Sequence, residues 1–183
     1  KKGYGDIMDK SILAVNKDSL ERVLVKNPMI KSAQVYYSLD GYIHVNIQQR
    51  EPVLRVLTGE GYYVDRDGRV MPLSSKFTSR VVVATGDINK KFACEKLGPF
   101  AMKLKNEPFW DAYIEQLVVR SNEDVVMIPK VGDFRIVLGK VDDCDARLEK
   151  LILFLKDGIT KKGWNRYKEI NLKFDNQVVC VRK

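Results

Sequence analysis

Residues 33–47 read Ala-Gln-Val-Tyr-Tyr-Ser-Leu-Asp-Gly-Tyr-Ile-His-Val-Asn-Ile, and this stretch decides how the first third of the chain folds. Apolar and polar side chains alternate on both sides of Asp40-Gly41, as they do in strands that bury one face. Asp-Gly between two alternating runs is a strong hairpin signal, because such turns need the positive φ that glycine adopts easily. The stretch therefore predicts two antiparallel strands joined by a tight turn.

A short amphipathic helix is predicted before this hairpin. Leu20, Val23 and Leu24 have helical spacing after the capping pair Asp18-Ser19. Pro28 ends the pattern, because proline disfavours helical backbone at the residue before it. The first third of the chain is therefore expected to run helix, strand, turn, strand.

The chain beyond Glu51-Pro52 is rich in short apolar runs separated by turn residues. Two helical patterns interrupt the runs, and Gly98-Pro99 is expected to split the first of them. Helices are expected over 87–106 and 142–156, and strands over 53–57, 62–64, 80–85, 113–120, 124–129, 134–138, 170–174 and 178–181. This succession predicts an α+β fold.

No catalytic motif stands out in the sequence. The single histidine, His44, falls on the polar face of a predicted strand, with no nucleophile or carboxylate motif around it. Phosphate-binding and nucleophile-elbow glycine motifs are also missing. We expect a protein that is not an enzyme and that uses no cofactor.

Metal ligands are not clustered either. Cys94, Cys144 and Cys180 are too far apart in sequence for a zinc motif, and we expect them to act as small buried apolar residues. Asp65-Arg66-Asp67-Gly68 resembles the start of a calcium loop, but Lys76 stands where such a loop needs a carboxylate. A tight turn is the better interpretation.

The net charge of +8 is concentrated near the C-terminus, where the last 28 residues hold eight basic and three acidic side chains. An acidic protein, an anionic membrane or a nucleic acid would fit this asymmetry, and so would a solvated surface. The tyrosine pairs at 36–37 and 62–63 could stack on bases. However, neighbours on a strand point to opposite faces, so half-buried strand aromatics fit better.

Five segments, taken in order, resemble the bacterial cell-division family FtsQ/DivIB. Leu24–Val35 is similar to the opening of a POTRA domain, and Val45–Val53 is similar to the exit strand of that domain, with Gln49 where many members have glutamate. The other matching segments are Tyr63–Val70, Ile136–Gly139 and Ile170–Phe174, in which Asn171 replaces the usual aspartate.

This resemblance implies an α+β chain made of a partial POTRA domain followed by a larger mixed β-sheet domain with flanking helices. The expected ranges are 1–52 for an N-terminally incomplete POTRA domain and 53–183 for the β domain. It also implies that the full-length protein has an N-terminal anchoring helix, absent here, in the inner membrane. This part would lie in the periplasm and collect at the division septum.

The resemblance further implies a non-enzymatic divisome scaffold that binds FtsB and FtsL, is linked to an FtsK-like recruitment partner and controls septal peptidoglycan synthesis. FtsB-like partners would add a strand to the C-terminal β-strand. The matching motif places that site at Ile170, Asn171, Leu172, Lys173 and Phe174. Arg147, on the supporting helix, is a candidate for binding a carboxylate.

Two other functions remain open at this point. A POTRA-type module of an outer-membrane assembly or secretion system would bind client strands. Such proteins are expected to carry several POTRA domains in tandem, whereas the sequence shows a single one. A basic nucleic-acid-binding domain would show affinity that falls steeply with salt, and the resemblance implies no nucleic acid.

Overall fold

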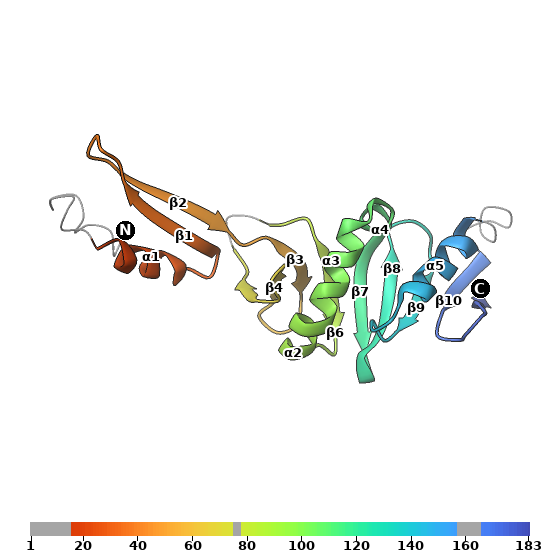
Figure 1. Ribbon diagram of the computed structural model, residues 1–183. Helices are drawn as coiled ribbons and strands as arrows, with labels where there is room; N and C mark the ends of the chain where they lie inside the picture. The colour runs from red at the N-terminus through yellow and green to blue at the C-terminus, as the bar shows by residue number, and fades with distance from the viewer. Residues whose placement is uncertain (1–15, 75–77, 157–165) are drawn as a thin grey trace. The chain divides into compact units, whose positions relative to one another are not determined.

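The computed structural model describes residues 16–74, 78–156 and 166–183 (Figure 1). The chain divides into two compact units, of which the first ends at Glu51 and the second begins at Pro52. Each unit has its own cluster of buried apolar side chains. They are described separately below.

The first unit contains helix α1 (Lys17–Val25) and an antiparallel hairpin of strands β1 (Ile30–Tyr37) and β2 (Ile43–Gln49). The predicted helix and hairpin are confirmed. Gly41 has a φ of 87°, which is the conformation that favours glycine at this turn. The helix begins one turn earlier than Asp18-Ser19 suggests, because Asn16 is the cap and accepts a hydrogen bond from the Ser19 N–H (3.1 Å).

A small core holds the first unit together. Leu24 of α1 packs on the hairpin residues Ile30, Ala33 and Val35. The other face of the hairpin is polar and exposed, and there the His44 ring stacks on Tyr36 with centroids 5.0 Å apart. His44 therefore lies on the exposed strand face that the sequence predicts.

The second unit is built on a mixed sheet with the strand order β11-β10-β9-β8-β7-β6-β3-β4-β5. Four helices and a π-helical turn, η2, connect its strands and pack on one face of the sheet (Figure 1). The strands are β3 (Pro52–Val56), β4 (Tyr62–Asp65), β5 (Val70–Pro72), β6 (Val82–Gly86), β7 (Ile114–Arg120), β8 (Asp124–Pro129), β9 (Arg135–Gly139), β10 (Tyr167–Asn171) and β11 (Val179–Arg182). The helical segments are α2 (Lys90–Phe92), η2 (Ala93–Leu97), α3 (Gly98–Asn106), α4 (Pro108–Tyr113), the short 3-10 turn η3 (Ser121–Glu123) between β7 and β8, and α5 (Asp145–Phe154).

The sheet is mixed because helical crossovers join some of its strands. The pairs β3–β6, β6–β7 and β9–β10 are parallel, whereas all other neighbours are antiparallel. A parallel connection needs a long crossover, and α2 to α4 supply it between β6 and β7. Helix α5 lies in the crossover between β9 and β10. The α+β class with a large mixed sheet and flanking helices is confirmed.

The first helical pattern of this unit differs from its prediction. Gly98-Pro99 does not split it, since a π-helical turn over Ala93–Leu97 leads directly into α3 and places Pro99 in the first turn. Proline is accepted there because the first N–H groups of a helix have no intrahelical partner. The separate helix α4 was not predicted, because its six residues are too few to show a period.

The Asp65–Gly68 segment is a turn, as the sequence suggests. The Asp65 carboxylate is buried and accepts hydrogen bonds from the backbone N–H groups of Asp67 (2.9 Å) and Arg69 (2.7 Å). Gly68 has a φ of 73°. The carboxylate thus closes the β4–β5 connection.

Candidate functional site

The C-terminal end of the large sheet leaves one backbone edge open. Strand β10 pairs with β9 on one side and with β11 on the other. Strand β11 comes last in the strand order, and the described part of the chain supplies no strand beyond it. An unpaired strand edge presents N–H and C=O groups that another chain can use.

The register shows which groups of β11 are available. Backbone groups of an antiparallel strand point alternately toward its partner and away from it. Lys183 donates its N–H to the carbonyl of Arg166 (3.2 Å), toward β10. The backbone groups of Arg182, and by the same alternation those of Cys180, therefore point outward.

Ile170, Asn171 and Leu172, predicted as the partner-binding strand, are enclosed by the sheet. Ile170 and Asn171 pair with β9 and with β11, so no strand can be added to them from either side. Leu172 is fully buried and donates its N–H to the Val137 carbonyl (2.9 Å). The open edge thus lies at β11 and not at residues 170–174, because the chain turns back after β10 and covers it.

Lys173 and Phe174 have a different position. They follow β10 and are exposed, with 46% of the Phe174 side chain accessible. The Lys173 ammonium pairs with Asp124 at 3.3 Å. These two residues follow β10 without belonging to a strand, and the Lys173 side chain reaches across β9 to β8.

Arg147, the predicted carboxylate-binding residue, holds the chain after β9. Its guanidinium donates to the carbonyls of Leu138 (2.7 Å) and Asp142 (2.6 Å). The sequence did not point to Lys150, whose ammonium donates to the carbonyls of Phe174 (2.6 Å) and Leu172 (3.4 Å). Lys150 lies three residues after Arg147, and residues at this spacing share a helix face. This spacing is the signal in the sequence that could have pointed to Lys150.

Ion pairs take up part of the positive charge around this edge. Arg135 pairs with Glu169 at 2.7 Å, and Lys183 pairs with Asp133 at 2.6 Å. The hydrogen bond from Lys183 lowers the pKa of the Asp133 carboxyl below its usual value. Other cationic side chains in this region make no ion pair with described residues, namely Arg166, Lys168 and Arg182. Within the part of the chain that the structure describes, β10 and β11 thus carry positive charge that no acidic side chain neutralises.

The opposite edge of the same sheet is poorly suited to strand addition. Strand β5 is three residues long, and its last residue, Pro72, has no N–H to donate. Short strands and proline are devices that keep an edge from pairing with other chains. Of the two edges, β11 is the one that can accept a strand.

No group of three or more metal-ligating side chains is found among the described residues. None of the described helices has the length and apolar character needed to cross a membrane. The backbone edge is thus the site with the clearest chemistry in this region.

Comparison with known proteins identifies the family of the chain. The family model "FtsQ/DivIB, C-terminal related" matches residues 51–181, which is most of the chain. The chain belongs to the FtsQ/DivIB family. The model "POTRA-like domain" matches residues 1–48, so this FtsQ/DivIB chain carries the POTRA-like N-terminal region that its sequence predicts. No curated protein matches the chain. Both families are non-catalytic domains of the scaffold type, and together they fit a divisome scaffold.

Proposed function

We propose that this chain is a scaffold of the bacterial divisome that binds FtsB- and FtsL-like proteins by strand addition to β11. Through these partners it would regulate septal peptidoglycan synthesis. The observation that supports this most is the open backbone edge of β11, on and next to which Arg166, Lys168 and Arg182 make no ion pair with described residues. Such charges steer an acidic segment and help to fix its register.

The predicted residues 170–174 take a new role in this proposal. Ile170 and Leu172 anchor β10 in the core, and β10 holds β11 in place. Phe174, which is exposed after β10, would offer apolar contact to the partner, and Lys173 would fix the chain after β10 through its ion pair with Asp124. Arg147 would act by holding the chain after β9 in place.

The proposed location follows the family. We place the protein in the inner membrane as a single-pass protein, with this part in the periplasm and enriched at the division septum. An FtsK-like protein would take part in its recruitment. These statements rest on the family match alone.

The decisive experiment is a calorimetric titration of the chain with the acidic C-terminal segment of the FtsB-like protein from the same organism. Two variants at one position separate backbone pairing from charge. Arg182→Pro removes an outward N–H and the charge, whereas Arg182→Gln removes the charge alone. We expect Arg182→Gln to lower the affinity for the segment a few-fold. Arg182→Pro should lower it by at least about tenfold more.

Thermal melts of both variants provide the control for folding. Arg182 is exposed at the end of β11, so both proteins should melt close to the parent. Equal affinities for the Pro and Gln variants would contradict strand addition at β11. Absence of binding to the segment and to a preformed FtsB–FtsL pair would contradict the function itself.

A further inference from the structure

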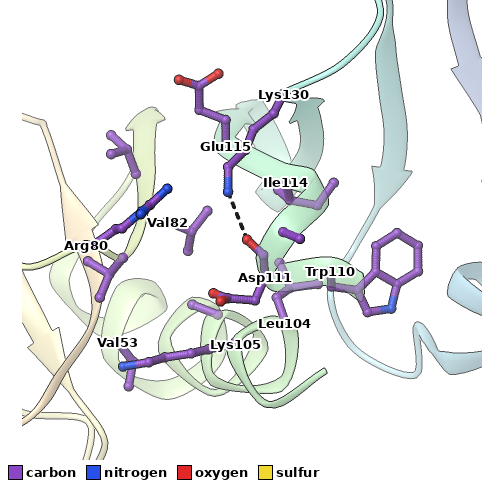
Figure 2. Close-up of a pocket in the computed structure, with 14 residues that line it drawn as sticks. Val53, Arg80, Val82, Leu104, Lys105, Trp110, Asp111, Ile114, Glu115 and Lys130 are labelled. Atoms are coloured by element: carbon purple, nitrogen blue, oxygen red, sulfur yellow. Dashed lines mark hydrogen bonds between the residues drawn. The ribbon is translucent and has the colours of Figure 1, made fainter. Parts of the chain in front are cut away.

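A second opening in the large sheet lies between β6 and β7. These parallel strands pair only from Val83 and Gln116 onward. Before that point Val82 is paired with β3 alone, and Ile114 is paired with β8 alone. A pocket of about 700 Å³ occupies the gap, a size typical of ligand sites (Figure 2).

The floor of this pocket is apolar. Helix α3 contributes Ala101 and Leu104, α4 contributes Trp110, and the strands contribute Val53 and Ile114. All five side chains are buried against the main core. The floor can therefore receive an aliphatic group of a ligand.

The walls carry more positive than negative charge, with Arg80, Lys105 and Lys130 against Asp111 and Glu115. Figure 2 shows Arg80 and Lys130 extending toward the same part of the pocket from opposite sides, while the Glu115 carboxylate points away from them. The Lys130 ammonium donates to the backbone carbonyl of Asp111 (2.9 Å). Arg80 makes no hydrogen bond or ion pair with any described residue.

This arrangement suits a carboxylate between the two cations. Arg80 and Lys130 are both exposed, so a ligand can reach them from solution, and charge-assisted hydrogen bonds are stronger than those between neutral groups. Backbone groups of β6 alternate in direction, and the bond from the Asp87 N–H to the Val119 carbonyl places those of Val81 toward β7. Val81 lies ahead of the first β6–β7 pair and lines the pocket, so its backbone has no partner on β7. Backbone pairing is available to an extended peptide and not to a small anion.

We propose that this pocket binds an extended acidic peptide, with a glutamate or aspartate side chain between Arg80 and Lys130 and an aliphatic neighbour on the apolar floor. The site is separate from β11, because β8, β9 and β10 lie between the two in the sheet. It does not depend on the function proposed for β11. A chain with both sites could hold two acidic segments at once.

Trp110 allows a direct test, because it lines the pocket and the chain has one other tryptophan, Trp164. In the Trp164→Phe chain, Trp110 is the sole tryptophan, and its emission reports on the pocket. The probe is acetyl-Val-Glu-Val-Glu-Val-amide, and the control peptide has glutamine in place of both glutamates. We expect a saturable change with the first peptide and affinity at least about tenfold lower with the second.

Two charge-removing variants in the same background locate the binding. Arg80→Gln should lower the affinity for the acidic peptide by about tenfold. Arg182→Gln, which removes a cation at β11, should change it by less than about twofold. Equal loss in both variants, loss in Arg182→Gln alone, or no saturable signal from Trp110 would each overturn the proposal. Circular dichroism of each variant confirms that the comparison is between folded proteins.

Discussion

At the scale of single residues, Gly86 shows how closely the strands approach each other. Its φ is 105°, and a Cβ at this position would lie 2.0 Å from the Val119 carbonyl oxygen. We expect Gly86→Ala to lower the unfolding free energy by about 3 kcal/mol or more, because backbone has to move. Urea unfolding gives the measurement.

Gly59→Ala is the matched control for this prediction. Gly59 also has a positive φ, of 62°, but a Cβ there meets nothing within 4 Å. Strain alone should lower the unfolding free energy by about 1 kcal/mol. Similar losses for the two variants would show that the close contact at Gly86 has no energetic weight.

Lys150 links the supporting helix to the segment behind the open edge. Replacing it with methionine keeps most of its apolar stem and removes the donor to the Phe174 and Leu172 carbonyls. We expect stability to fall by about 1 kcal/mol and the affinity for an FtsB-like segment to fall several-fold. Glu149→Gln, on the neighbouring exposed position, should leave both unchanged in urea unfolding and calorimetry.

Phe174→Glu tests the exposed flank of the same edge. Because nearly half of the Phe174 side chain is accessible, the variant should melt within a few degrees of the parent. Its affinity for an acidic partner should fall, since it removes apolar contact and adds a like charge. A large drop in melting temperature would instead assign Phe174 to the core.

The buried phenol of Tyr113 should make the unfolding free energy of the large unit fall at alkaline pH. Burial raises the pKa of its phenol to about 12, whereas a phenol in the unfolded chain ionises near pH 10. Its stabilising contribution is therefore complete below about pH 10 and is lost as the pH rises toward about 12. The stability difference between the parent and Tyr113→Phe, from urea unfolding, should shrink across that range.

At the scale of elements, hydrogen exchange can test the orientation of β11. The amides of Cys180 and Arg182 point outward and should exchange quickly in the free protein. Those of Val181 and Lys183 point toward β10 and should exchange more slowly. Addition of a partner strand should protect the first pair selectively, and protection of neither pair would contradict pairing at this edge.

The elements also show what the sequence could and could not predict. The Asp40-Gly41 hairpin and most strands of the large sheet follow from local alternation and turn residues, which need no knowledge of distant contacts. The order of those strands does not, because the parallel pairs depend on long crossovers, through helices or through β4 and β5, that bring distant segments together. For the same reason, the sequence motif at 170–174 could not show that another strand pairs with it. That pairing depends on where Val179–Arg182 return to the sheet, which no local pattern predicts.

At the scale of the whole molecule, the two units have very different cores. Among the described residues, four buried apolar side chains form the core cluster of the first unit, against thirty in that of the second. We therefore expect unfolding in urea to depart from a single transition. Amide protection of β1 and β2 should be lost at lower urea than the Trp110 fluorescence of the large unit, and coincident curves would show that the two cores unfold together.

The place of β11 at the end of the sheet has a consequence for biogenesis. A chain emerges from the ribosome, and crosses a membrane, from its N-terminus onward, so β11 is made after every strand that supports it. An incomplete chain can thus bury much of its sheet and still lack the strand that would receive a partner. Competence to assemble would arise only in molecules whose synthesis has passed residue 182, and unfinished copies would be excluded from the complex without any separate checkpoint.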